Sequence, residues 1–412
     1  MKTKGPIAAN VIISGAGPAG MALAALLARA GLKVALIDAE PLKPANSPEK
    51  PSGRTAALLS GSVNILKQTG IWNDLKGRIT PMKAMRLIDD SHTDGKTVRV
   101  EFHAAEIGRA EFGYNIPNSI LNEVLRKQIG ALSGITLFRP SKLADYRIEK
   151  NSVIATLDDG REITAPLLVG CDGRNSKVRE VAKIGAFTRD YGQTAMTFLI
   201  NHSKPHDCTA TEFHRPGGPF TFVPMGGNTA SVVWAEKTED AKTLLAMKKQ
   251  DFTRILQDRS LGLLGEITMA SDPQSWPLMF LRADDLAGER IALAAEAAHV
   301  MSPIGAQGLN LSLRDVAALA ETIVDAARLG EDIGSGTVLK RYARRRNLDF
   351  QTRTAGIDAF NRIVANDVSF IKELRRLGLR GLEAIPALKN IATQQGLNPA
   401  MDEGRLLAGR PL

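Results

Sequence analysis

The chain contains little cysteine: its 412 residues include two, Cys171 and Cys208. So few thiols exclude a disulfide-stapled scaffold and indicate a reducing compartment. Neither cysteine has the neighbours of a metal site, so we expect no bound metal and interpret both as core or surface thiols. Repeats and low-complexity tracts are also absent.

Long uncharged runs are rare, and the run at residues 11–28 is just long enough to span a bilayer. Three glycines and a proline crowd into one turn of it, which suits a loop better than a lipid-facing helix. The same turn argues against a signal peptide, although basic residues near the N-terminus imitate the start of one. We therefore expect no membrane-spanning segment.

Aromatic residues make up 5% of the chain, whereas its net charge is +9. The basic residues gather late, at 340–346 and 372–380, and no nucleic-acid motif accompanies them. We therefore expect no nucleic-acid partner and favour an anionic membrane surface. A solvated basic face is the alternative for each run taken alone.

A chain of this length exceeds one ordinary hydrophobic core. Its 44% hydrophobic and 24% charged residues are typical of a soluble globular protein. We therefore expect two domains, or one large domain with an insertion.

A βαβ unit with a dinucleotide-binding fingerprint occupies residues 11–38. An apolar strand precedes the glycine turn, an Ala/Leu-rich helix follows it, and a second apolar strand ends at Asp38. In such a turn Gly15 makes the bend, Gly17 lets a pyrophosphate approach the backbone, and Gly20 lets helix and strand pack closely. Asp38 can accept hydrogen bonds from a ribose diol. Because this spacing also arises by chance, other motifs must support it.

A second carboxylate is expected at the same edge of the sheet. The buried run at 165–170 opens into Cys171-Asp172-Gly173, and the carboxyl ends of parallel strands form the ligand-binding edge. An ordinary Asp-Gly turn is the alternative. Arg54 ends a proline-rich loop at 41–53 and either returns over the pyrophosphate or lies on the surface.

A third segment of small residues follows the apolar strand at 290–294. It runs from Ala295 to Asn310 and leads into a helix that carries Arg314 and Asp315. Backbone N–H groups in such a segment can hold an anion or a ring. His299 within it is an acid or base candidate, but we favour a histidine bonded to nearby backbone.

Hydrophobic periodicity predicts the remaining elements. We expect helices at 60–75, 119–131 and 240–256, a turn at 113–117, a hairpin over 145–158, and strands at 97–102, 135–138, 194–201, 210–214, 220–224 and 230–235. The strands of 187–277 predict a sheet that forms the second wall of a cleft. The basic tail after residue 336 is predicted helical, with a kink at Pro386. Its stretch 370–392 either caps the core or rests on a membrane.

Together these segments resemble the three flavin motifs of class A flavoprotein monooxygenases. The segments are Gly15-Ala16-Gly17-Pro18-Ala19-Gly20, Cys171-Asp172-Gly173 and residues 296–315. More narrowly, the chain resembles the ubiquinone-biosynthesis hydroxylases, which are FAD enzymes that oxygenate a polyprenylated aromatic ring. The resemblance covers nearly the whole chain and includes Arg54, Gly113-Tyr114, residues 191–193 and 218–224, Trp234 and residues 339–346.

The resemblance implies an α/β fold with a Rossmann-like FAD-binding domain, an inserted α+β substrate domain and a C-terminal helical region. The FAD-binding domain would comprise residues 1–80, 107–186 and 278–330. The substrate domain would comprise 81–106 and 187–277, and the C-terminal helices 331–412.

It also implies a set of FAD-binding residues. Gly15, Gly17, Ala19 and Gly20 would hold the pyrophosphate and Asp38 the adenosine ribose, with Arg54 near the FAD. Asp172 and Gly173 would lie between FAD and the approach of the nicotinamide cofactor. Glu296 would lie beside the ribityl chain, and Pro303, Gly305, Ala306, Gln307, Gly308 and Asn310 would line the flavin ring. Pro303, Gly305 and Gly308 are the catalytic candidates.

Two departures from the family pattern occur in the third motif. The usual Gly-Asp pair is Ala295-Glu296 here, and the usual Ala-Gly before Gln is inverted to Gly305-Ala306. Because glutamate is one methylene longer, its ribityl contact must shift. The carboxylate and the backbone donors are retained, so we expect FAD still to bind.

The resemblance implies hydroxylation of a polyprenyl phenol in ubiquinone biosynthesis, with FAD as cofactor, NADH or NADPH as electron donor and O₂ as oxidant. The protein would be cytoplasmic, peripheral on the inner face of the membrane, with other ubiquinone-biosynthesis proteins as candidate partners. The alternatives are a non-catalytic subunit with a vestigial flavin site and a related flavin reductase. A halogenase would show a Trp-rich motif, which is absent.

Overall fold

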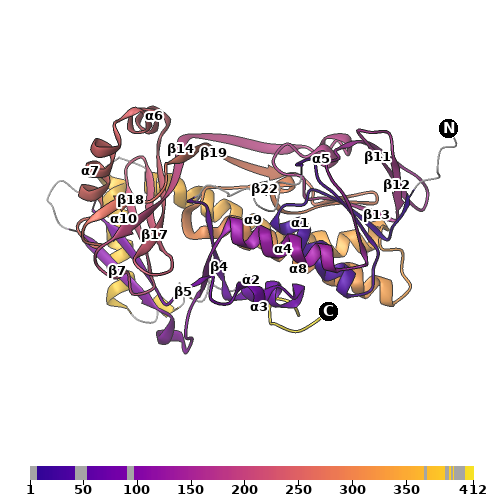
Figure 1. Cartoon of the computed structure of the whole chain (residues 1–412), viewed down its shortest axis with the longest axis horizontal. Coiled ribbons are helices and arrows are strands. Elements are labelled where there is room, and N and C mark those ends of the chain that lie inside the picture. The colour runs from indigo at the N-terminus through magenta and orange to yellow at the C-terminus, as the bar shows by residue number, and fades with distance from the viewer. Residues whose placement is uncertain are drawn as a thin grey trace.

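The computed structural model describes residues 7–41, 53–90, 97–365, 369–385, 389–390, 393 and 404–412. The molecule is elongated, with a parallel sheet and its helices at one end and a large antiparallel sheet at the other (Figure 1). Two long strands, β14 (Ala186–His202) and β19 (Gln274–Ala283), run between the two ends and pair with each other.

The parallel sheet is built around the predicted βαβ unit. Its strand order is β20-β21-β13-β2-β3-β9. The strands are β2 (Val11–Ser14), β3 (Val34–Ile37), β9 (Ile135–Phe138), β13 (Leu167–Gly170), β20 (Ala287–Gly288) and β21 (Ile291–Leu293). Because β2, β3 and β13 are buried along their whole length, they show no polar–apolar alternation, and their one polar residue is Ser14 at the end of β2. The carboxyl ends of β2 and β13 therefore lie side by side, in register from Val11↔Leu167 to Ser14↔Gly170.

Helices cover this sheet, and α1 (Pro18–Arg29) packs against α4 (Asn118–Ala131) and α8 (Gln307–Arg328). The smaller helices nearby are α2 (Ser60–Thr69), α3 (Trp72–Leu75) and α5 (Lys177–Val181). A four-stranded sheet adjoins this end, in the order β1 (Ile7–Ala8), β12 (Glu162–Ala165), β11 (Val153–Leu157) and β10 (Leu143–Ile148). A three-stranded sheet of β4 (Thr55–Leu59), β8 (Gly113–Pro117) and β5 (Thr80–Met82) lies nearer the middle.

The large sheet has nine strands and holds the second core. Along it lie β22 (His299–Val300), β19, β14, β17 (Thr229–Lys237), β16 (Gly218–Pro224), β15 (Thr209–Arg215), β6 (Ala84–Asp89) and β7 (Val98–His103), and β18 (Ile267–Met269) pairs with β14. One face packs an aromatic cluster under α6 (Thr238–Ala246) and α7 (Lys249–Arg259); the cluster contains Phe198, Phe213, Phe220, Phe222, Trp234 and Phe252. Strands β6 and β7 join this sheet although about 100 residues separate them from its other strands in sequence.

The tail forms α9 (Gly336–Ala365) and α10 (Ser369–Ala384). Helix α9 packs on α8 and extends to β15 and β16, whereas α10 lies over β7. Short 3₁₀ turns occur at η1 (Ala104–Ile107), η2 (Ala295–Ala297) and η3 (Ile304–Ala306). No helix in the described part of the chain is both long enough and apolar enough to cross a bilayer.

The predicted fold class is confirmed, and three local predictions are wrong. Residues 113–117 form strand β8 rather than a turn, because they pair with β4 and β5. The helix predicted at 60–75 is divided at Gly70, which has a φ of 90°. The helix predicted at 240–256 is two helices, because Met247 is extended. The proline-rich segment 42–52 and the kink at Pro386 lie outside the described residues.

Candidate active site

The phosphate loop, residues Gly15 to Gly20, is closed on its protein side and open at Gly17. Gly15 has a φ of 102°, and a Cβ there would overlap the carbonyl group of Cys171. A Cβ at Gly20 would overlap the carbonyl oxygen of Gly15. A Cβ at Gly17 would meet no atom within 4 Å. Gly15 and Gly20 are therefore required by packing, whereas Gly17 leaves room for a ligand.

The start of α1 is suited to bind an anion. It has no side-chain cap and no acidic residue in its first turn, and Pro18 occupies its first position. Its first N–H groups therefore have no partner within the helix, and the helix dipole is positive there. Ala19, which belongs to this turn, is buried. A pyrophosphate fits this end of the helix.

Asp38 lies at the end of β3, as the predicted ribose contact requires. Its Oδ1 accepts a hydrogen bond of 2.9 Å from the Glu40 N–H, and its Oδ2 is 3.8 Å from Arg139 Nη2. The side chain is largely shielded from water but not sealed. The contact with the ribose itself stays a prediction.

Asp172 is next to the phosphate loop, at the end of β13. Its Oδ2 accepts hydrogen bonds from the Lys177 and Val178 N–H groups at 2.9 and 3.2 Å. Its Oδ1 is buried and has no hydrogen-bond partner. Burial raises the pKa of Asp172, although hydrogen bonds from Ser176 and the two amides oppose it. A buried acceptor without a partner, at the loop that begins with Gly15, fits a ligand that carries hydroxyl donors, such as the ribose of FAD.

The flavin-ring loop is our name for residues Pro303 to Gly308. Gly305 and Ala306 have φ values of 62° and 54°, so two successive residues are left-handed. Gly305 and Gly308 are exposed, and a Cβ at Gly308 would meet nothing within 4 Å. Gln307 Oε1 is buried without a partner. The loop thus presents open backbone and an unused acceptor, which fit a flat polar ring system.

Asn310 holds the flavin-ring loop against β4. Its Nδ2 donates to the Ala306 and Ala57 carbonyls at 2.7 and 2.9 Å, and its Oδ1 accepts from the Leu59 N–H at 2.9 Å. The side chain is buried and all of its hydrogen-bonding groups are used within the protein. Asn310 therefore positions the loop, and its side chain has no group left for the ring.

A buried ion cluster supports the third motif from behind, and sequence reasoning missed it. Asp315 Oδ2 accepts from the Ala295 N–H at 3.0 Å and contacts His299 Nε2 at 2.7 Å, and its Oδ1 accepts from Arg346 Nε at 2.7 Å. His299 thus has a carboxylate partner that the sequence did not predict, and its expected bond to nearby backbone stays a prediction. Burial alone would raise the pKa of Asp315, but Arg346 and His299 outweigh it and lower the pKa.

The same cluster corrects the interpretation of residues 340–346 as one basic face. Arg346 and Tyr342 are buried, and the Tyr342 hydroxyl donates to the Leu293 carbonyl at 2.8 Å. The only signal in the sequence was an acid, Asp315, set among apolar helix positions. Such a residue requires a buried cation or donor.

Two further predicted residues lie on the surface. Glu296 is exposed and follows Ala295, which has a φ of 57°. Arg54 is also exposed, and its guanidinium carbon lies 4.6 Å from the centre of the Trp276 ring of β19. Their predicted roles beside the ribityl chain and near the FAD stay predictions.

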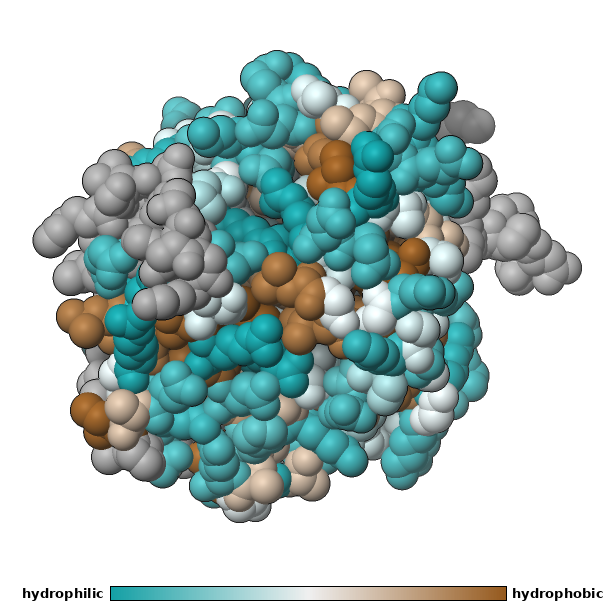
Figure 2. All heavy atoms as spheres, turned by 90° about the vertical axis from the view of Figure 1, so that its left-hand side faces the viewer, coloured by the Kyte–Doolittle hydropathy of each residue, from teal (hydrophilic) through white to brown (hydrophobic). Residues whose placement is uncertain are grey.

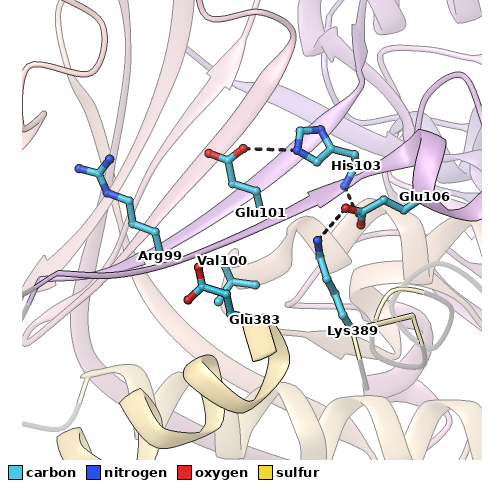
Figure 3. Close-up of a pocket in the computed structure, with 7 residues that line it drawn as sticks. All are labelled: Arg99, Val100, Glu101, His103, Glu106, Glu383 and Lys389. Atoms are coloured by element: carbon cyan, nitrogen blue, oxygen red, sulfur yellow. Dashed lines mark hydrogen bonds and ion pairs between the residues drawn. The ribbon is translucent and has the colours of Figure 1, made fainter. Parts of the chain in front are cut away.

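A separate cavity of about 300 Å³ lies between β7 and the region after α10 (Figure 3). Lys389 Nζ is 2.7 Å from Glu106 Oε1 there, and His103 Nε2 is 3.4 Å from Glu101 Oε2. Arg99, Val100 and Glu383 complete its lining. None of these residues belongs to the three motifs, so this cavity is distinct from the predicted flavin site.

Comparisons with known proteins agree with this geometry. The family model described as "FAD binding domain" matches residues 8–353. Ubiquinone hydroxylase UbiL of Rhodospirillum rubrum is 35% identical, over 98% of this chain and 94% of its own length. The 3-demethoxyubiquinol 3-hydroxylase of Escherichia coli is 31% identical, over 94% of this chain and 98% of its own.

Solved structures share the fold. PqsL, a probable FAD-dependent monooxygenase from Pseudomonas aeruginosa, matches with a TM-score of 0.76 and 21% identity, over 90% of this chain and 99% of its own. The p-nitrophenol 4-monooxygenase PnpA from Pseudomonas putida matches with a TM-score of 0.77 and 17% identity, over 98% of this chain and 100% of its own. The chain therefore belongs to the FAD binding domain family, and within it to the FAD-dependent monooxygenases of the ubiquinone hydroxylase group.

Proposed function

We propose that this enzyme hydroxylates the aromatic ring of a polyprenylated phenol in ubiquinone biosynthesis, with FAD, NADH or NADPH, and O₂. The observation that carries the proposal is the close approach of Gly15 to Asp172 at one sheet edge. The turn that begins at Gly15 leaves open space at Gly17, and Asp172 Oδ1 is a buried acceptor without a partner. The names of the ubiquinone hydroxylase relatives support the choice of substrate class.

The chemistry divides between cofactor and protein. When bound, FAD would pass electrons from NADH or NADPH to O₂, and O₂ would supply the oxygen atom that enters the ring. The chain would hold the pyrophosphate at α1, fixes the flavin-ring loop through Asn310, and brings Glu212 of the large sheet to that loop. Small residues and a proline in that loop leave room for the ring and for little water.

The test is NADH-driven oxygen uptake by the purified yellow protein with a short-chain prenylated phenol, followed by mass spectrometry of the product. We expect uptake that depends on the phenol and a product heavier by one oxygen atom. Oxygen uptake without that product identifies a flavin reductase or an oxidase. Bound FAD with no uptake identifies a vestigial subunit, which the exposed Glu296 in place of the usual aspartate would permit.

We propose further that α10 rests on an anionic membrane. The basic run at 372–380 does not form one exposed basic face. Arg375 and Arg376 point inward, and Arg375 Nε binds Asp89 Oδ2 at 2.5 Å. Leu377 is instead 65% exposed, and Ile385, directly after the helix, is 46% exposed. Figure 2 shows this end of the molecule, where hydrophobic residues gather among hydrophilic ones. A polyprenyl chain dissolves in a bilayer, so such a surface would bring the enzyme to its substrate.

The membrane proposal is tested by co-sedimentation with anionic and neutral vesicles at several salt concentrations. Leu377→Asp should release the protein from anionic vesicles, whereas Leu329→Asp, also strongly exposed but on the helix end of α8, should not. Equal binding of both variants would refute a role for α10.

A further inference from the structure

The large sheet directs one carboxylate at the flavin-ring loop. Glu212 lies on β15, and its Oε2 accepts a hydrogen bond of 3.4 Å from the N–H of Gly305, which is 93 residues further along the chain. The Glu212 side chain is 12% exposed. It is therefore shielded from bulk water yet still open to a small molecule that enters beside the loop.

The second oxygen of this carboxylate is held by a buried histidine. His214 Nε2 lies 3.0 Å from Glu212 Oε1, and its side chain is fully buried. The two residues point to the same face of β15, because side chains alternate along a strand. Phe213 between them points into the aromatic cluster on the opposite face. The Glu212–His214 pair thus faces away from that core and toward the loop.

Charged groups on the elements packed against β15 have partners of their own. The β6 residue Asp89, opposite His214, binds Arg375, and Arg86 binds Glu101. On α9, Asp358 binds Arg189 and Tyr191. Strand β16 and the flavin-ring loop contain no titratable side chain. Within the described residues, Glu212 is thus the carboxylate that bonds to the loop where the ring hydroxylation is expected.

We propose that Glu212 accepts the proton of the substrate's ring hydroxyl and that His214 is a positioning residue for it. The phenolic O–H bond breaks, the proton moves to a Glu212 oxygen, and the electron pair stays on the ring oxygen. This negative charge raises the electron density at a ring carbon, and that carbon then takes the oxygen atom. NADH or NADPH supplies the electrons, and O₂ is the oxidant. When that carbon loses its hydrogen as a proton to water, Glu212 returns its proton to the ring oxygen. This inference rests on the proposed function.

The experiment compares Glu212→Gln, Glu212→Asp and His214→Asn with wild type, using NADH and a short-chain prenylated phenol between pH 6 and 10. Glutamine keeps an acceptor for the Gly305 N–H but takes up no proton. We expect product formation by Glu212→Gln to fall about 100-fold at pH 7 and to rise about tenfold per pH unit toward the phenol's own pKa. Wild type should be nearly flat over this range. FAD content and melting temperature should stay unchanged in Glu212→Gln.

The other variants separate chemistry from structure. Glu212→Asp should recover part of kcat with the wild-type pH profile, and His214→Asn should lower kcat about tenfold with a smaller change in KM. Glu239→Gln, an exposed carboxylate on α6, is the matched control and should match wild type. A Glu212→Gln enzyme within twofold of wild type at pH 7, or one with the wild-type pH profile, overturns the inference. Wild type that forms no hydroxylated product overturns the proposed function and this inference with it.

Discussion

The phosphate loop and the flavin-ring loop are both built from small residues, but different forces hold their backbones. In the phosphate loop, backbone atoms touch so closely that only glycine fits at Gly15 and Gly20. In the flavin-ring loop nothing crowds Gly305 or Gly308, and side chains from elsewhere fix the path, chiefly Asn310. A loop held by contact is visible in its own sequence, whereas a loop held by remote side chains is not.

The largest effect should come from the close-packed loop. Gly15→Val places a side chain on the Cys171 carbonyl at a φ of 102° and should cost about 4 kcal/mol or more, with loss of bound flavin. Gly17→Val is the matched control, because Gly17 is extended with open space around it. It should fold with a nearly unchanged melting temperature and bind FAD about 100-fold more weakly. A Gly15→Val protein that purifies yellow at full occupancy would refute the phosphate role.

Next in size is the ion cluster behind the third motif. Asp315→Asn should destabilise the protein by about 3 kcal/mol at pH 7, because Arg346 loses a buried partner. Since the pKa of Asp315 is lowered in the folded state, its stabilisation is present above about pH 4 and is lost as the pH falls through the folded value. Chemical denaturation at pH 7 and at pH 3 measures this. Asp332→Asn, in a half-exposed pair with Arg290, should cost about 1 kcal/mol or less.

Asp172, the buried carboxylate at the end of β13, should change the stability with pH in the opposite direction to Asp315. Because burial raises the pKa of Asp172, its contribution to stability is present below its ordinary pKa and is lost as the pH rises through the raised value. Asp172→Asn should therefore make the apoprotein more stable at neutral pH. FAD affinity should fall about tenfold, because the amide oxygen stays with the Lys177 and Val178 N–H groups and the NH₂ group, a donor, replaces the free Oδ1. Thermal melts of the apoprotein and flavin titration report the two effects. Unchanged FAD affinity would contradict the assignment of the free Oδ1 to the cofactor.

The smallest effect concerns the two left-handed alanines. Ala295 and Ala306, at φ values of 57° and 54°, stand where the resembled family usually has glycine. Left-handed alanine costs about 1–2 kcal/mol, so each Ala→Gly change should stabilise the fold by about 0.5–1 kcal/mol after the entropy cost of glycine. Ala317→Gly, inside α8, should instead destabilise it by about 1 kcal/mol. Equal losses at all three positions would show that the two left-handed sites carry no strain.

Local sequence was sufficient for the parallel sheet and for two of the three motifs. Strands β2, β3 and β13 are apolar except at Ser14 because both faces are buried, and the glycine turn follows β2 directly. Prediction failed where a distant partner decided the outcome. Strand β8 exists because β4 and β5 pair with it, and Asp315 binds an arginine 31 residues away.

The basic tail shows the same limit. A run of arginines predicts positive charge, but not whether each side chain points to the solvent or to the core. Arg346 and Arg375 point inward because each binds a buried carboxylate, Asp315 and Asp89 respectively. Helix α10 keeps its predicted position in the chain, yet Arg375 and Arg376 are buried in it while Leu377 and Arg380 meet the solvent.

By itself, the sequence determined the glycine turn from Gly15 to Gly20 and the buried strands around it, because glycine conformations and strand burial are set within a few neighbouring residues. Only the tertiary structure decided which side chains support those segments. Glu212 reaches Gly305, and Asp315 reaches Arg346, across distances in the chain that no local pattern encodes. The physical reason is that a buried charge is stable only with a partner, and folding rather than sequence spacing brings that partner to it.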